Sequence, residues 1–330
     1  MTHPRELSIA FQTDKQPDIY SDLAREVERY GFDALSMYSD LTYQPPIVPL
    51  TLAALATSTI RLGPASLNPF TLHPVEIAGQ IATLDMVSKG RAYLGISRGA
   101  WLDAIDIEQE RAIDRVVDTF GTVRHLLSRS GYEFRGKTFK MRPDVRLRYE
   151  PQRPDVPMMV GSWGPRLIKA ASSLVDEIKL GGSANPDVVP VVREWIGSSA
   201  DAADPAIVLG AVTIVDEDGD EARAAVKREM ALYLPVVAPL DPTVAVDPAL
   251  LENIERLVRE GRVDDAGRQI PDSLVRRFAF AGTPGDVIEQ CEAVFEAGAG
   301  RIEFGTPHGL STASGIKLLG DVVLPSLANH

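Results

Sequence analysis

Three glycine-rich segments follow predicted strands, and they carry residue types that can hold an anion or a planar ring. Such turns let the backbone approach a ligand closely and point N–H groups at a phosphate. Because the segments stand at successive strand ends, the sequence predicts a site for a cofactor that carries an anion. The residues are Ser97 and Gly99; Gly161, Ser162, Trp163 and Gly164; and Gly181, Gly182, Ser183 and Asn185.

Sequence signatures of several other chemistries are missing. The chain has no Gly-x-Ser-x-Gly nucleophile turn, no HExxH metal pair, no Walker-type phosphate loop and no GxGxxG after a strand. Only two of the five histidines, His73 and His308, fall near predicted strand ends. No close pair of carboxylates suits glycoside chemistry. We therefore expect no metal ion in the site.

Predicted strands, which recur along the chain, determine where the glycine-rich segments lie. Short apolar runs, each followed by a longer stretch, predict strands at residues 7–12, 34–38, 60–65, 92–97, 156–160, 177–180, 207–215 and 301–305. Runs bounded by Gly or Pro are typical of buried parallel strands, and strand–helix alternation is typical of an α/β fold. In a barrel the carboxyl ends of the strands meet at one face, where the site then lies.

Eight strand–helix units favour a closed (β/α)8 barrel, a TIM barrel, with an open doubly wound sheet as the alternative. Residues 1–330 are expected to form one such domain, because barrels of about 200–400 residues fold as a unit. Two longer connections, near 100–155 and 216–280, are predicted to be insertions after barrel strands. The first should hold a helix near 111–128 and a hairpin at 132–139, and the second should be helical. Such insertions are commonly lids or subunit contacts.

The composition restricts the class of partner. The 330 residues include 46 Asp or Glu and 34 Lys or Arg, a formal charge of −12 that argues against nucleic acid. Cys291 is the single cysteine, so no disulfide framework can form within one chain. No apolar run reaches the roughly 18–20 residues that cross a bilayer, and the start of the chain is polar. We expect a small-molecule substrate, no membrane partner and a cytoplasmic location.

The segment at residues 60–74, IRLGPASLNPFTLHP, resembles the bacterial luciferase-like superfamily. Further matching stretches lie at 81–96, 157–165, 281–284 and 315–320, so the resemblance covers nearly the whole chain. Within the superfamily, the chain is most similar to the coenzyme F420-dependent methylenetetrahydromethanopterin reductases. These motifs are specific for the superfamily and less so for the reductases.

The resemblance implies a (β/α)8 barrel with insertions, a homodimer, and a deazaflavin (coenzyme F420) or FMN at the carboxyl face. It implies a cis peptide bond between Ala65 and Ser66, which forms a bulge behind the cofactor ring. It places Asp40 beside the ring, as the catalytic group that tunes the ring or its proton. Ser66 and Asn68 would bond the polar edge of the ring, and the three glycine-rich segments would line the cofactor and its phosphate.

Three positions depart from the family pattern. Ala10 and Ala100 stand where the methylene reductases carry Glu and Asp, and Leu41 stands where the superfamily's dehydrogenases carry His. Hydride transfer itself needs no protein proton donor, only a ring carbon about 3–3.5 Å from the acceptor carbon. The leading hypothesis is an F420-dependent oxidoreductase that transfers a hydride to or from a small or pterin-like substrate. The alternatives are an FMN-dependent monooxygenase and a non-catalytic cofactor-binding protein.

Overall fold

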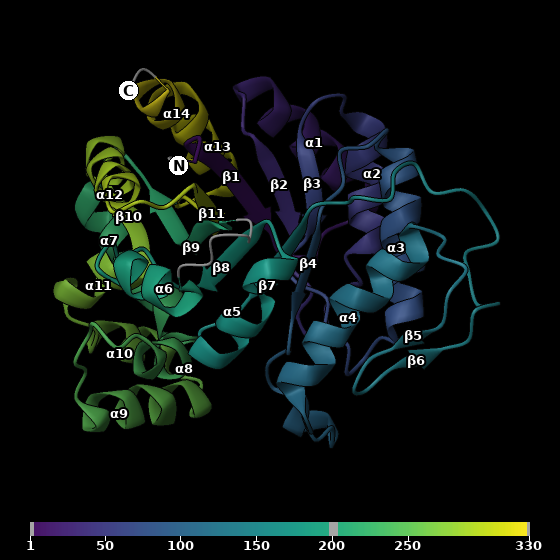
Figure 1. Cartoon of the computed structure of the whole chain (residues 1–330). Helices are drawn as coiled ribbons and strands as arrows, with labels where there is room; N and C mark the ends of the chain where they lie inside the picture. Colours follow the sequence, from purple (N-terminus) through teal and green to yellow (C-terminus); the bar gives the residue numbers. More distant parts are fainter. Residues whose placement is uncertain (1–2, 198–203, 329–330) are drawn as a thin grey trace.

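Parallel strands form the centre of the molecule, as the recurring apolar runs predict (Figure 1). The computed structural model describes residues 3–197 and 204–328. All eight predicted strands are present, with ends shifted by a few residues. They are β1 (Glu6–Phe11), β2 (Ala34–Met37), β3 (Arg61–Pro64), β4 (Leu94–Ser97), β7 (Met158–Gly161), β8 (Glu177–Gly181), β9 (Ala206–Val215) and β11 (Arg301–His308).

The sheet formed by these strands is nearly closed. Its order is β3-β2-β1-β11-β9-β8-β7-β4, and neighbouring strands are parallel. Single bridges between Leu62 and Ala92, and between Leu67 and Ile96, bring the edges at β3 and β4 together. The structure therefore confirms the (β/α)8 barrel over the open doubly wound sheet.

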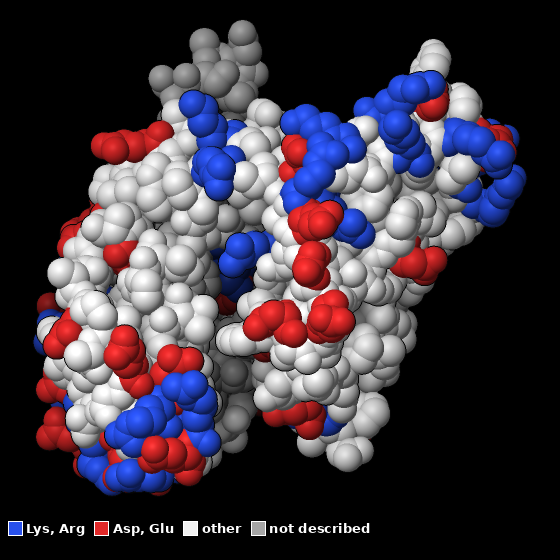
Figure 2. Space-filling model, turned by 90° about the horizontal axis from the view of Figure 1, so that it is seen from below, with Lys and Arg blue, Asp and Glu red and all other residues white. Residues whose placement is uncertain are grey.

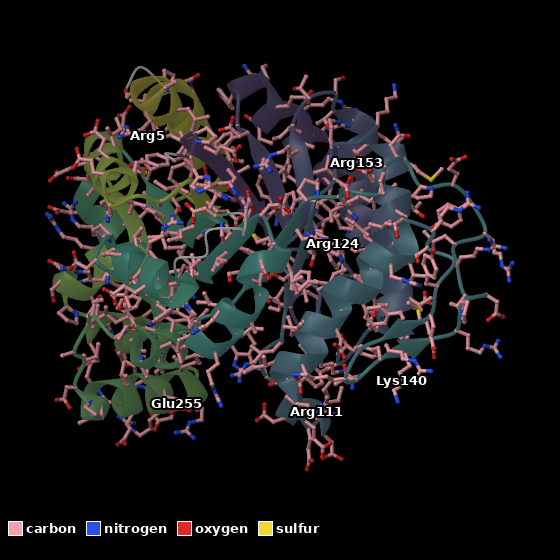
Figure 3. The ribbon with its side chains drawn as sticks, viewed as in Figure 1. Arg5, Arg111, Arg124, Lys140, Arg153 and Glu255 are labelled. Carbon is pink, nitrogen blue, oxygen red and sulfur yellow. The ribbon has the colours of Figure 1, made fainter. Side chains whose placement is uncertain are left out.

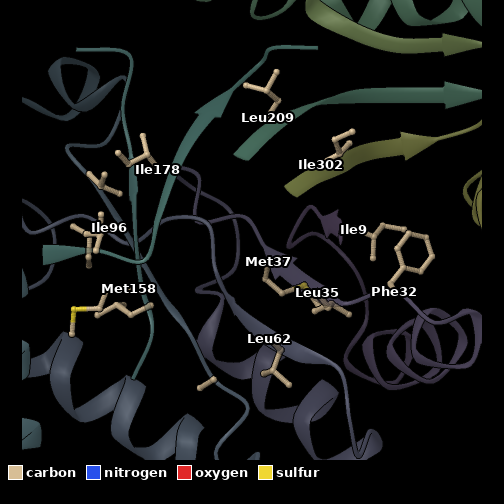
Figure 4. Packing of buried hydrophobic residues seen from close by; sticks show 14 of the residues in the cluster. Ile9, Phe32, Leu35, Met37, Leu62, Ile96, Met158, Ile178, Leu209 and Ile302 are labelled. Atoms are coloured by element: carbon tan, nitrogen blue, oxygen red, sulfur yellow. The ribbon is translucent and has the colours of Figure 1, made fainter. Parts of the chain in front are cut away.

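Helices cover the outside of the barrel, and their apolar faces bury the outward side chains of the strands. Ile9, Leu35 and Ile302 are fully buried in this core, part of which Figure 4 shows. No helix in the described ranges combines the length and apolar character needed to span a bilayer. The outer helices are α1 (Pro17–Tyr30), α2 (Ile47–Ala56), α3 (Pro74–Val87), α4 (Ala112–Leu127), α5 (Pro165–Ala171), α6 (Val188–Ile196), α12 (Pro284–Glu296), α13 (Thr312–Leu318) and α14 (Leu324–Leu327).

Both predicted insertions are present. Between β4 and β7, a 3-10 turn η1 (Leu102–Ile105) precedes α4, and β5 (Phe134–Arg135) pairs antiparallel with β6 (Lys140–Met141), which confirms the helix and the hairpin. The segment after β9 is helical, as predicted, and has an apolar cluster of its own. Its helices lie at the lower left of Figure 1 and are α7 (Gly219–Ala231), α8 (Leu234–Val237), α9 (Pro248–Arg259), α10 (Val263–Arg268) and α11 (Asp272–Phe278).

One strand, β10 (Ala279–Gly282), is absent from the sequence prediction. It pairs in parallel with the C-terminal half of β9, residues 212–215, whereas β8 pairs with the N-terminal half, residues 206–210. Two alanines and a glycine have weak strand propensity, so the segment is not distinguished from the helical insertion before it. The insertion is thereby tied into the barrel sheet at its C-terminal end.

Candidate active site

The part of the barrel interior near the amino ends of the strands carries charges, where most barrels hold branched apolar side chains. Lys179 of β8 and Glu303 of β11 form a buried ion pair, and the Ser36 hydroxyl of β2 donates to the same carboxylate. Arg301 bonds Glu177 at 2.5 Å. Because these side chains meet each other, they identify the positions of each strand that face into the barrel.

Each charge in this network has a partner of opposite sign, as buried charges require. Arg61 extends the network by pairing with Glu6 and Glu177, and Arg301 also lies 3.4 Å from Glu303. Burial alone would raise the pKa of Glu303, but the nearby charges of Lys179 and Arg301 hold that pKa below its ordinary value. Glu303 is therefore ionised at neutral pH.

The next interior layer, toward the carboxyl ends of the strands, consists mostly of small residues and is open at Gly181. Strand side chains alternate between the two faces, so the inward positions recur every second residue. A Cβ added at Gly181 would meet no atom within 4 Å, which marks open space at this level. Tyr38 and Val212 are the larger side chains at this level, and the other inward positions carry small residues: Ala10, Ala65, Ser97, Gly161, Gly181 and Gly305.

The open layer lies at the lower end of the molecule as drawn in Figure 3. Arg5 and Arg153, which precede strands, lie at the upper end, whereas Arg111 and Glu255, which follow strands, lie at the lower end. Figure 2 views the molecule from this lower end and shows a hollow with basic groups inside it. A pocket of about 590 Å³ opens there between residues 98–109 and Val236 of α8. Ligand sites of proteins have volumes of about 300–1,000 Å³.

The peptide bond between Ala65 and Ser66 is cis, as the resemblance implies. It directly follows β3, at the edge of the open layer. The Ser66 hydroxyl points into the barrel, since a Cβ at Gly95 or Gly161 would lie 3.3 Å or 3.2 Å from Ser66 Oγ. These two glycines thus leave room for the turn. The contact between Ser66 and the cofactor ring stays a prediction.

Asp40 follows β2 and is exposed at the mouth of the barrel. Gln12, which follows β1, donates from Nε2 to Asp40 Oδ2 at 2.7 Å and so fixes the carboxylate beside the open layer. A carboxylate with one such donor keeps acceptor capacity for an N–H group of a ligand. The role of Asp40 beside the ring stays a prediction.

The glycine-rich segments after β4, β7 and β8 lie side by side. Ser97 pairs with Gly161 across the sheet, and Trp163 Nε1 donates to the Gly181 carbonyl at 2.9 Å. Two hydroxyls shape the turns: Ser97 Oγ accepts the Gly99 N–H at 3.3 Å, and Ser162 Oγ accepts the Gly164 N–H at 2.9 Å. The structure therefore brings together the segments that the sequence singled out.

The side chain of Asn68 accepts hydrogen bonds from the backbone of its own turn. Its Oδ1 accepts the backbone N–H groups of Phe70 and Thr71 at 3.1 Å and 3.0 Å. Only 8% of Asn68 is exposed. The carbonyl oxygen is thus used by its own turn, and the contact of Asn68 with the cofactor ring stays a prediction.

The predictions for Ser183 and Asn185 need correction. Both residues are fully buried. Asn185 Nδ2 donates to Asp241 and Thr243 at 2.8 Å each, and Oδ1 accepts from Arg277 at 2.5 Å. Ser183 Oγ accepts the Asn185 N–H at 3.2 Å. These side chains fasten the helical insertion to the barrel instead of lining the cofactor.

Sequence reasoning missed the interior charges, although a signal for them exists. Glu177 and Lys179 stand two residues apart in one apolar run, and Arg301 and Glu303 do so in another. Charges at alternate positions of a buried strand indicate a polar interior face. His308, noted near a strand end, is fully buried, and burial lowers its pKa to about 4. Among the described residues, no group of three or more His, Cys, Asp or Glu is placed to hold a metal ion.

A barrel of parallel strands with an open mouth, surrounded by glycine turns, places this protein in the class of (β/α)8 barrels with a candidate site at the carboxyl ends of the strands. Comparison with known sequences agrees with this class. The chain matches the family described as luciferase-like monooxygenase over residues 7–301, and it belongs to that family.

Several known proteins are similar to this chain over most of their own length. The chain is 31% identical over 295 residues to 5,10-methylenetetrahydromethanopterin reductase of Archaeoglobus fulgidus, covering 84% of this chain and 86% of the relative. It is 28% identical to the reductase of the same name from Methanopyrus kandleri, covering 94% and 95%. The solved coenzyme F420-dependent tetrahydromethanopterin reductase of Methanopyrus kandleri superposes with a TM-score of 0.84 at 24% identity, covering 98% and 99%. An F420-dependent secondary alcohol dehydrogenase superposes at 0.75 with 18% identity, covering 98% and 99%. The superpositions confirm the fold.

Proposed function

We propose that this protein is a coenzyme F420-dependent oxidoreductase that transfers a hydride between the deazaflavin and a small or pterin-like organic substrate. The observation that carries the proposal is the open space at Gly181, at the mouth of the barrel beside the glycine-rich turns. The relatives support the choice of cofactor, because the names of two of them, an oxidoreductase and a glucose-6-phosphate dehydrogenase, include dependence on coenzyme F420.

The residues of the mouth fit such a cofactor. When bound, the deazaflavin supplies or accepts the hydride. The Ala65–Ser66 turn and Asp40 would hold the ring, with the Asp40 carboxylate as an acceptor for an N–H group. The backbone amides of Ser162, Gly164 and Gly182 already donate within the fold, so the hydroxyl and ring side chains of the turn at 161–164 would line the phosphate end. No side chain at Ala10, Leu41 or Ala100 can move a proton, so Asp40 is left as the carboxylate beside the ring and the other mouth residues would orient the reactants.

The experiment fills the open layer without disturbing the fold. Gly181→Leu places a side chain where a Cβ meets nothing within 4 Å, and Gly131→Leu makes the same change at an equally open position on the distant hairpin connection. We expect Gly181→Leu to weaken F420 binding by at least about tenfold, since the ring loses its space, while Gly131→Leu binds as the wild type does. Binding is measured by quenching of F420 fluorescence, and the melting temperature of each variant checks the fold.

The FMN-dependent monooxygenase remains a distinct candidate, because the family description names a monooxygenase. The same titration with FMN separates the two. Tight FMN binding without F420 binding would replace the proposed cofactor. Binding of neither would remove the cofactor proposal altogether, and F420 binding without turnover of any acceptor would favour the non-catalytic alternative.

We further propose a single-domain chain that works as a homodimer in the cytoplasm. The apolar stripe on α2 supports the dimer: Val48 and Leu55 are 58% and 71% exposed, and half-buried Leu52 lies between them on the same face. Side chains at this spacing form one face of a helix. The unpaired buried thiol of Cys291 suits a reducing compartment, and the pairing of β10 with β9 makes the insertion part of the barrel.

A further inference from the structure

The pocket of about 590 Å³ beside the barrel mouth has an apolar wall that the chain itself leaves uncovered. Trp101, Ile107 and Val236 contribute this wall. Trp101 exposes 52% of its surface. A flat ligand stacked on the indole would remove that surface from water and gain ring–ring contact.

The loop that forms the pocket is held in shape by its own contacts. Gln109 Nε2 donates to the carbonyl of Arg98 and, at 3.2 Å, to that of Gly99, so the end of the loop is fastened to its beginning. Trp101 and Asp106 have φ values of 56° and 59°, which residues other than glycine adopt rarely. Such conformations persist only where surrounding contacts fix them. A preformed pocket lowers the entropic cost of binding.

The charges of the pocket differ from those that suit an anion. Its lining, all within the described part of the chain, has the carboxylates Asp103, Asp106 and Glu108 against one guanidinium, Arg98. Figure 2 shows acidic groups along one side of the hollow and basic groups deeper inside it. The field of three carboxylates repels a phosphate or carboxylate. The anionic part of a cofactor is therefore better held at the glycine turns, and the pocket is left for the other reactant.

We propose that this pocket binds the substrate, a proposal that rests on the proposed function. The pocket selects a ring-containing molecule without negative charge over a phosphorylated one. Trp101 and Val236 shape the pocket around the ring, and the three carboxylates discriminate against anions. The pocket opens beside Gly99, so a molecule in it lies next to the segments predicted to hold the cofactor.

The first test measures the charge preference with a matched pair of probes, 2-naphthol and 2-naphthyl phosphate, by equilibrium dialysis against the full chain with and without F420. We expect 2-naphthol to bind at least about tenfold more tightly, because each carboxylate adds repulsion for the phosphate. The triple variant D103K/D106K/E108K should narrow this ratio to about twofold or reverse it. The triple variant D22K/D144K/E150K, which makes the same change of net charge at exposed sites remote from the pocket, should retain the wild-type ratio. Equal binding of the two probes to the wild type would overturn the proposal.

The second test measures the aromatic wall. Trp101→Ala should weaken 2-naphthol binding by at least about tenfold, and Trp101→Phe should stay within about threefold of wild type, because a ring is restored. Tyr132→Ala, which removes an aromatic side chain that is 81% exposed elsewhere, is the control. Unchanged binding in Trp101→Ala, with the fold verified by melting temperature, would refute the pocket. Because the probes are read without turnover, a protein that fails to bind F420 but keeps the probe preference would lose the proposed function and keep this inference.

Discussion

Lys179 neutralises Glu303 inside the barrel, where the two side chains are 8% and 0% exposed. We predict that Lys179→Met lowers the free energy of unfolding by about 3–5 kcal/mol, because the carboxylate is left buried without its partner. Urea denaturation measures the loss. The double variant K179M/E303L removes both charges and should recover part of the stability. A single variant as stable as the wild type would show that water reaches Glu303.

His308 makes stability depend on pH, because the folded protein keeps its ring neutral. Burial lowers the pKa of His308 from 6.5 to about 4. Between these values the unfolded chain binds more protons than the folded one, so stability is lost as the pH falls from 6.5 toward 4. The pKa difference corresponds to about 3 kcal/mol. His308→Gln should flatten this part of the profile of unfolding free energy against pH.

The control for His308 is a histidine at the surface. His73 is exposed and caps α3 by accepting the Val75 N–H at 3.2 Å. His73→Asn retains a cap acceptor, so the pH profile of that variant should follow the wild type. An unchanged slope in His308→Gln would mean that another group is responsible for the acid-dependent loss.

At the scale of elements, the loop after β8 fastens the insertion to the barrel through Asn185. We predict that Asn185→Ala lowers the free energy of unfolding by about 1–3 kcal/mol, because buried partners lose their hydrogen bonds. Hydrogen exchange of the backbone near Asp241 and Thr243 should become faster, since their contact with the loop is gone. Asn253→Ala, at a half-buried position of α9 where the side chain accepts from the exposed Arg256 of the same helix, should change neither quantity. Unaltered exchange near Asp241 in Asn185→Ala would show that other contacts hold the insertion.

The sequence contains enough to place the barrel strands, because each is an apolar run bounded by turn residues. β10 escapes prediction because Ala279, Ala281 and Gly282 have no strand character apart from their partner β9. The cis bond at Ala65–Ser66 can be predicted from the resemblance to a known family, because no rule of local sequence specifies a cis peptide bond before serine. The roles of Asn68 and Asn185 depend on which partners the fold brings to them. An amide at a loop suits a ligand and a loop anchor equally well, so the sequence alone does not separate the two.

At the scale of the whole molecule, the exposed stripe of α2 predicts an interface between two copies. Val48→Lys combined with Leu55→Lys should convert a dimer into a monomer, because charges would be buried against the partner copy. Light scattering after gel filtration measures the mass. Leu232→Lys combined with Leu310→Lys changes apolar side chains of 52% and 41% exposure elsewhere and should leave the mass unaltered. A wild-type mass of one chain would remove the dimer proposal.

Along one edge, β9 pairs first with β8 and then with β10. This pairing limits how far the insertion can move away from the barrel. The ladder of β10 with residues 212–215 joins the far end of the insertion to the same strand from which the insertion departs. An outward rotation of α7–α11 as one rigid lid would have to break that ladder, and the buried contacts of Asn185 with it. The insertion therefore resists outward rotation, whereas the loop at residues 98–111 has no strand pairing with the barrel.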